Sequence, residues 1–210
     1  KPKAAVKLPV FMPSLDKLYP DNAKLPKFFD GKKMVLDKLD GASVLLTYIK
    51  GKPVRLTTRG NGTVGKDISY LIKGLNLPEQ KATFSCHIRC EAVMTRKTFA
   101  AHYADKYDNA RNLVNGLLNR HTVSPEMAYV RLVALGVYGL PYLKSYQALR
   151  AIKFPVPFAA FAKDETGLSA LLAERKLESP YEIDGLVLID PEQEYSYESA
   201  KRPKWTYAFK

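Results

Sequence analysis

Hydrophobic and polar residues alternate along several parts of this chain in the two-residue period that is typical of β-strands. Residues 46–58 place strand-forming residues on both sides of a turn sequence at residues 50–53, which predicts a β-hairpin. Short strands are also predicted before it, at residues 34–36, and after it, at residues 86–90. Between them, residues 59–65 contain three glycines, which favour backbone angles that other residues rarely adopt.

Other segments follow the longer period of α-helices. Residues 98–107 and 109–119 are predicted to be helical, and in the second segment Leu113, Leu117 and Leu118 share one face. Ser124-Pro125-Glu126 is a typical helix start, and residues 168–176 predict a further short helix. Strand-like runs return at residues 131–138, 183–190 and 202–210. Because strands and helices follow one another without a regular alternation, we expect an α+β fold.

The composition narrows the function classes. The chain has 210 residues, of which 46% are apolar, and this is enough for a core. Its net charge of +12 favours a polyanionic partner, although a basic protein without such a partner is the alternative. The apolar stretches are too short for a membrane span, so we expect no membrane partner. Cys86 and Cys90 are too few for a disulfide framework or a zinc site, so we expect them to pack within a strand, in a reducing cytoplasm.

Lys38-Leu39-Asp40-Gly41 is the first of several segments that can perform chemistry. Four common residues are a weak signal alone, and a solvated lysine at a turn is the alternative to a nucleophile. An ordered series of further segments strengthens the signal. It comprises residues 58–67 with Arg-Gly-Asn-Gly, Arg89-Cys90-Glu91, Ala110-Arg111-Asn112, Val137-Tyr138-Gly139, residues 181–187 with Glu-Ile-Asp-Gly, and residues 203–210, which end in Ala-Phe-Lys.

This order and spacing, together with Pro13-Ser14-Leu15-Asp16, resemble the adenylation domain of bacterial NAD-dependent DNA ligases from about residue 10 to residue 210. The resemblance implies a nucleotidyltransferase (ATP-grasp-like) fold of two or more antiparallel sheets flanked by helices. It implies a single adenylation domain over residues 1–210, without the N-terminal nicotinamide mononucleotide (NMN) recognition module and the C-terminal oligonucleotide-binding module. We expect a piece of a longer protein, or one subunit of a split enzyme, from the cytoplasm of a bacterial or phage-infected cell.

The resemblance also implies an activity. Lys38 attacks the α-phosphate of NAD and forms lysyl-AMP. The AMP then passes to the 5′-phosphate of nicked double-stranded DNA, and the 3′-hydroxyl seals the nick. A lysine amine is a nucleophile only when it is unprotonated, and the charge that develops on the phosphoryl oxygens needs a cation. By resemblance, Lys210 supplies that cation.

Three carboxylates complete the expected catalytic set. Asp40, Glu91 and Asp184 are expected to bind Mg²⁺, a hard cation that prefers oxygen ligands. Glu91 is also expected to contact the ribose.

The resemblance assigns further residues to the nucleotide and to the DNA. Tyr138 is expected to stack on the adenine, with Val187 on the other face of the base. A helix-surface arginine is the alternative interpretation of Arg111. The nucleotide pocket is expected to include Ser14, Leu15 and Arg59, and the DNA contacts to include Lys66, Arg111, Arg120 and Lys204.

The chain departs from the family pattern at three positions. Ile189 stands where the family has a lysine that binds the α-phosphate, Leu36 where it has glutamate, and Cys90 where it has glycine. Because no NMN-recognition module is matched and the Lys38-to-Gly41 core is shared across the superfamily, an ATP-dependent DNA or RNA ligase of the same superfamily is one alternative. A nucleic-acid-binding subunit without catalysis is the other, against which stands the presence of all five expected catalytic residues.

Overall fold

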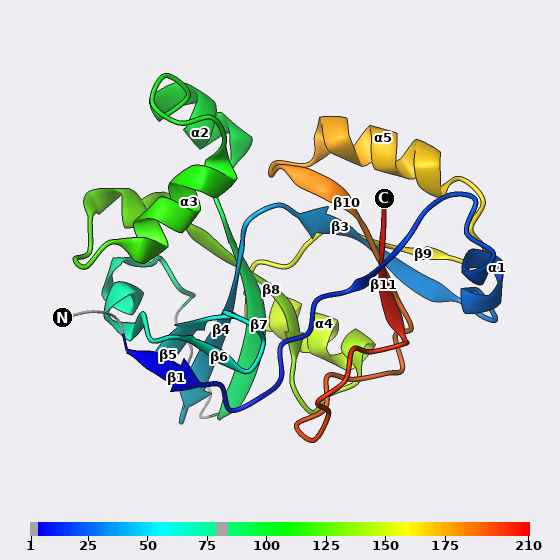
Figure 1. The fold of residues 1–210 in the computed structure, drawn as a ribbon, viewed down its shortest axis with the longest axis horizontal. Helices are drawn as coiled ribbons and strands as arrows, with labels where there is room; N and C mark the ends of the chain where they lie inside the picture. The colour runs from blue at the N-terminus through cyan, green and yellow to red at the C-terminus, as the bar shows by residue number, and fades with distance from the viewer. Residues whose placement is uncertain (1–3, 79–83) are drawn as a thin grey trace.

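The computed structural model describes residues 4–78 and 84–210, which form two large β-sheets and a small one with helices around them (Figure 1). One sheet is antiparallel and has the order β5-β4-β7-β8, with bounds Lys52–Thr58, Ala42–Ile49, Cys86–Val93 and Arg131–Val137. The other has the order β2-β11-β10-β3-β9, with bounds Asp16–Leu18, Thr206–Phe209, Ile183–Ile189, Lys33–Leu39 and Ala159–Ala162. Strands β1 (Ala5–Lys7) and β6 (Val64–Lys66) form a separate pair. The α+β prediction is confirmed, although β2 runs parallel to β11 within its sheet.

The predicted hairpin is strands β4 and β5. Lys50 and Gly51 have φ angles of 50° and 75°. Two such left-handed residues make the tight turn whose twist matches that of the flanking strands. Strand β4 pairs with β5 on one side and with β7 on the other, and residues 44–48 are all buried. This central position explains why residues 44–48 are mostly apolar, with only Thr47 polar, instead of strictly alternating.

The predicted helices are present with one change of length. Helix α3 (Ala110–Asn119) begins where Asn109 accepts a hydrogen bond from the amide of Asn112 at 2.8 Å. Helix α5 (Leu168–Glu178) and the short 3₁₀ helix η2 (Pro125–Tyr129) also lie where they were predicted. Helix α2 (Arg96–His102) is shorter than the predicted 98–107, because Tyr103 has a φ of −136° and the chain leaves the helix there.

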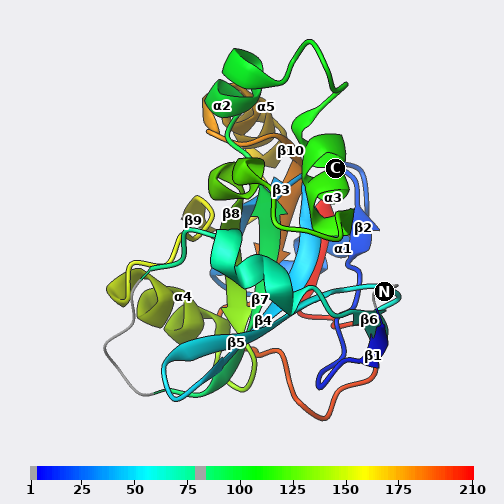
Figure 2. The ribbon, with the colours of Figure 1, turned by 90° about the vertical axis from the view of Figure 1, so that its left-hand side faces the viewer.

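Three helical elements were not predicted: α1 (Lys24–Phe28), the 3₁₀ helix η1 (Ser69–Gly74) and α4 (Tyr142–Ala151). Helix α4 is held against the end of β8 by Ser145, whose hydroxyl accepts from the amide of Val137 at 3.2 Å and donates to its carbonyl at 3.3 Å. Helices α4 and α2 lie at opposite ends of the four-stranded sheet (Figure 2). None of the helices in the described part of the chain is long and apolar enough to cross a membrane.

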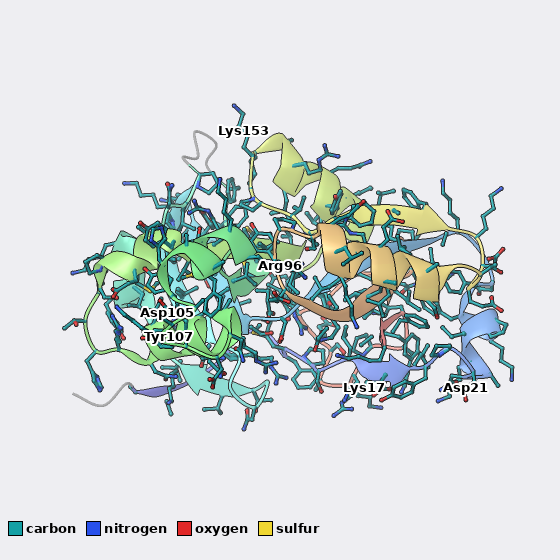
Figure 3. All side chains as sticks on the ribbon, turned by 90° about the horizontal axis from the view of Figure 1, so that it is seen from above. Lys17, Asp21, Arg96, Asp105, Tyr107 and Lys153 are labelled. Atoms are coloured by element: carbon teal, nitrogen blue, oxygen red, sulfur yellow. The ribbon has the colours of Figure 1, made fainter. Side chains whose placement is uncertain are left out.

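The two large sheets are joined directly by Asp40-Gly41, the turn between β3 and β4. Gly41 permits a close crossing at this point, because a Cβ atom there would lie 2.2 Å from the carbonyl oxygen of Ala92. From this turn β3 and β4 run in different directions (Figure 1), so the sheets diverge. Arg96 of α2 links the two halves by donating to the carbonyl of Lys176 in α5 at 2.6 Å (Figure 3).

Candidate active site

A cleft of about 780 Å³ lies where the two sheets diverge. Lys38 and Asp40 reach it from β3 and the turn that follows, and Glu91 reaches it from β7. The cleft brings together every residue predicted for the site except Tyr138, Arg120 and Lys204. The predicted residues that line it are Ser14, Leu15, Lys38, Asp40, Arg59, Lys66, Glu91, Arg111, Asp184, Val187 and Lys210.

Lys38 and Lys210 share one carboxylate. The Nζ atom of Lys38 lies 2.8 Å from Oδ1 of Asp184, and the Nζ atom of Lys210 lies 2.7 Å from Oδ2. Burial would raise the pKa of Asp184, but the hydrogen bonds from Lys210 and Lys38 outweigh burial and lower it. The side chain of Lys38 remains 27% exposed. The nucleophile candidate therefore stands at the cleft beside a second cation, and a charged carboxylate holds both.

Glu91 lies deeper in the cleft wall, almost completely buried. Its Oε2 accepts a hydrogen bond from the hydroxyl of Ser43 at 2.8 Å, across the β4–β7 pairing. Burial raises the pKa of Glu91, while the Ser43 hydrogen bond and the charges of Arg89 and Lys38 oppose that rise. Ser43 was not predicted as a site residue, and its position opposite Glu91 depends on a strand register that the motifs do not reveal.

Asp40 and Arg111, which both line the cleft, form an ion pair. Nη1 of Arg111, at the start of α3, lies 2.7 Å from Oδ1 of Asp40. Half of the Arg111 side chain is exposed, so solvent screens this pair. Arg111 thus lines the cleft while remaining on the exposed surface of α3, and its assignment to the DNA stays a prediction.

Each of the three carboxylates predicted to bind Mg²⁺ has a partner within the chain: Arg111 binds Asp40, Ser43 binds Glu91, and two lysines bind Asp184. Among residues 4–78 and 84–210, no group of three Asp, Glu, His or Cys side chains is arranged to hold a metal ion by itself. Mg²⁺ usually keeps several waters and takes one or two carboxylates together with substrate phosphates. The oxygen donors present fit that smaller role.

Tyr138 does not line the cleft, contrary to the prediction. It is buried against Tyr195, and its hydroxyl donates to the carbonyl of Phe11 at 2.7 Å. Arg89 pairs with Gly136 and Cys90 with Ala134, so Leu135 is an extra residue in β8, a β-bulge. Tyr138 shares the sheet face of Arg89 but lies farther along β8, where Tyr195 and the N-terminal segment cover it. Leu135 faces the cleft instead, and nothing in an apolar run distinguishes it from a core residue.

Two of the predicted DNA contacts lie outside the cleft in ion pairs. Arg120 pairs with Glu126 at 3.1 Å, and Lys204 pairs with Asp16 at 2.8 Å. Each of the two cations therefore has a carboxylate partner within the chain, and their contact with DNA stays a prediction.

Further residues that line the cleft were not predicted. They include Lys17, Ser43, Arg89, Asn115, Asn119 and Leu135. Arg89 could have been found, because it precedes Glu91 by two residues on a strand, and such residues face the same side.

Two departures from the family pattern lie next to each other. Leu36 and Ile189 share a buried cluster with Met34 and Tyr142. In the sheet, Leu36 pairs with Val187, and Met34 pairs with Ile189. The side chain of a lysine at position 189 would lie in this apolar cluster. Leu36 and Ile189 instead both contribute apolar surface to it.

Comparisons with known proteins identify the family of this chain. Residues 14–210 match the model of the NAD-dependent DNA ligase adenylation domain. The chain is 34% identical over 218 residues to a DNA ligase of Acanthamoeba polyphaga mimivirus, covering 98% of this chain and 34% of that protein. It is 32% identical over 199 residues to the DNA ligase of Shouchella clausii, covering 82% of this chain and 29% of that protein. The chain thus spans about a third of the length of the curated relatives it matches.

Solved structures share the fold at low identity. A mycobacterial DNA ligase D complexed with ATP matches with a TM-score of 0.54 and 12% identity, covering 93% of this chain and 60% of that chain. An archaeal ATP-dependent RNA ligase matches with a TM-score of 0.57 and 13% identity, covering 88% of this chain and 46% of that chain. At such identities the likeness extends to the fold alone. With nearly the whole chain matched by one family model, this chain belongs to the family of NAD-dependent DNA ligase adenylation domains.

Proposed function

We propose that this domain performs the nucleotidyl-transfer step of DNA ligation, in which Lys38 becomes covalently linked to AMP from NAD. The observation that supports this most is the pair of lysines at one carboxylate in the cleft. Lys38 supplies an amine with access to the cleft. Lys210 supplies a cation bound to the other oxygen of the same carboxylate. A cation placed in advance where phosphoryl charge develops stabilises a transition state without reorganisation.

Each side chain has a separate part in the proposal. The lowered pKa of Asp184 makes it a poor proton acceptor, so we assign it the task of positioning both ammonium groups. Glu91, hydrogen-bonded to Ser43, is placed to accept from a ribose hydroxyl. Val187 and Leu135 line the cleft from different sheets and offer apolar surfaces to the two faces of a base.

Magnesium would be held by Asp184 or Glu91 together with phosphate oxygens, and would neutralise charge on those oxygens. NAD is the proposed donor because the family whose model matches is NAD-dependent. ATP is the second candidate, since a structural neighbour is complexed with ATP. Nicked double-stranded DNA is the proposed acceptor of the AMP, and the domain's net charge of +12 suits a phosphate backbone.

The test is intact-mass spectrometry after incubation with Mg²⁺ and either NAD or ATP. We expect a gain of one AMP with NAD, and no gain for Lys38→Ala. Lys144→Ala, which removes an exposed lysine of α4, is the matched control and should still gain AMP. A gain with ATP alone would transfer the proposal to the other donor. An adduct that persists in Lys38→Ala, or no adduct in the unaltered chain with either donor, would contradict it.

A further inference from the structure

Arg89 is a buried cation at the cleft whose hydrogen bonds are incomplete. Its side chain is 6% exposed and lines the cleft from β7. Nη2 donates to the carbonyl of Pro13 at 2.6 Å, and the guanidinium lies over the ring of Tyr195, 5.2 Å from its centroid. Nε and Nη1 have no hydrogen-bond partner among the described residues. Since Nε carries one hydrogen and Nη1 two, three of the five N–H groups lack an acceptor.

A charged group in this situation is costly in free energy unless something completes its hydrogen bonds. Buried N–H groups are nearly always paired in folded proteins, and exceptions call for a specific explanation. Tyr138 makes a side-chain hydrogen bond to the guanidinium and supports its charge, but among the described residues Nε and Nη1 still have no acceptor. This side chain borders the cleft, so a ligand bound there is placed to supply the missing acceptor.

The position of Arg89 indicates which part of a nucleotide comes nearest. Strands β3 and β4 diverge from Asp40-Gly41, so Lys38 and the Ser43–Glu91 pair mark the end of the cleft near the turn. Arg89 precedes Glu91 by two residues on β7, which places it about 7 Å farther from that end. There it pairs with Gly136 of β8, beside the bulged Leu135.

Beyond Arg89 the space between the sheets is closed. Tyr138, Tyr195 and Trp205 fill it together with apolar side chains from the N-terminal segment. A nucleotide whose phosphate lies at Lys38 therefore directs its base toward the closed end, where Leu135, Val187 and Arg89 line the cleft.

We propose that Arg89 recognises the edge of the adenine base by donating N–H hydrogen bonds to a ring nitrogen. This inference rests on the proposed nucleotide-binding function and adds a determinant of base specificity to it. Adenine offers N1, N3 and N7 as acceptors, while its amino group is a donor that an arginine cannot bind. A short rotation of the side chain toward the cleft makes Nε and Nη1 available to such an acceptor. The Pro13 carbonyl, held by Nη2, fixes the neighbouring segment with Ser14 and Leu15 at the same end of the cleft.

The experiment uses AMP itself, because AMP is common to both possible donors. Calorimetric affinities are measured for AMP and for its 1-deaza, 3-deaza and 7-deaza analogues, each of which replaces one ring nitrogen by C–H. For the unaltered protein we expect one analogue to bind about tenfold more weakly, as expected when a charge-assisted hydrogen bond is lost. Arg89→Met should bind AMP about tenfold more weakly and should not distinguish that analogue from AMP. Arg131→Met is the matched control, since Arg131 makes one bond to the Ala128 carbonyl and does not line the cleft.

Each alternative outcome has a separate meaning. If Arg89→Met keeps the same analogue ratio as the unaltered protein, or if no analogue binds the unaltered protein more weakly, the inference is overturned. If Arg89→Met does not fold, as judged by circular dichroism, Arg89→Lys supplies the ratio, because it keeps the charge but not the geometry of the donors. Failure of AMP to bind the unaltered protein would instead overturn the proposed nucleotide-binding function from which the inference starts.

Discussion

Asp37 and Arg175 form a buried ion pair whose removal should show how much β3 depends on α5. Nε of Arg175 lies 2.9 Å from Oδ1 of Asp37, and a second bond of 2.9 Å joins Nη2 to Oδ2. The side chains are 9% and 2% exposed. Arg175→Met leaves the Asp37 carboxylate buried without its partner, on the strand residue that precedes Lys38.

The structure allows the size of this effect to be estimated. Removing one member of a buried ion pair typically costs about 3–5 kcal/mol, because the remaining charge is uncompensated. The other contacts of Arg175 add little: its guanidinium lies 4.1 Å from the centroid of the Phe158 ring, and its bond to Glu178 is near the surface. At roughly 2–4 °C per kcal/mol for a chain of this size, the midpoint of thermal unfolding should fall by roughly 6–20 °C.

A double-mutant cycle separates the pair from its surroundings. Asp37→Leu combined with Arg175→Met should recover most of the loss, because an apolar pair of similar volume is often as stable as the buried ions. The measurement is urea unfolding of the four proteins, followed by circular dichroism. Arg202→Met is the control: Arg202 pairs with Asp16 at 3.0 Å, both side chains are substantially exposed, and a loss below about 1 kcal/mol is expected. Equal losses in Arg202→Met and Arg175→Met, or additive effects in the cycle, would refute this reasoning.

Two further predictions concern Glu91 and Gly116. Because burial raises the pKa of Glu91, its contribution to stability is present below about pH 4.5, the ordinary value, and is lost as pH rises through the folded-state pKa. Glu91→Gln should therefore gain free energy of unfolding relative to the unaltered protein between pH 4.5 and pH 8, as measured by urea titrations at several pH values, and an unchanged difference would contradict this. Gly116 lies within α3 and a Cβ atom there would meet nothing within 4 Å, so Gly116→Ala should stabilise the protein by about 0.5–1 kcal/mol. Thermal unfolding tests this prediction, with Gly65→Ala as the opposing case, since a Cβ there would lie 1.9 Å from the Thr58 carbonyl oxygen.

The elements that the sequence predicts well are those whose signals are local. The β4–β5 hairpin depends on a two-residue turn and its flanking strand formers, and α3 depends on the Asn109 cap and one leucine-rich face. Helix α4 gave no such signal. It has no side-chain cap at Pro141, and its packing depends on Ser145 bonding to the end of β8, which is a tertiary contact.

The candidate site shows the same division between local and distant information. Ordered motifs predicted which segments meet at the cleft, and eleven of the fourteen residues assigned to the site do line it. The motifs could not predict where along β8 the cleft ends. The bulge at Leu135 puts Tyr138 on the same sheet face as Arg89, but farther along the strand, where Tyr195 and the N-terminal segment cover it.

The charges of the cleft also could not be assigned one residue at a time. Asp184 was predicted as a metal ligand because carboxylates bind Mg²⁺, but here it has two ammonium groups for partners. A carboxylate that accepts from both Lys38 and Lys210 keeps two cations close to each other, which their mutual repulsion would otherwise oppose. The structural role of Asp184 thus follows from its neighbours, which lie 146 and 26 residues away in the chain and which only the fold brings to it.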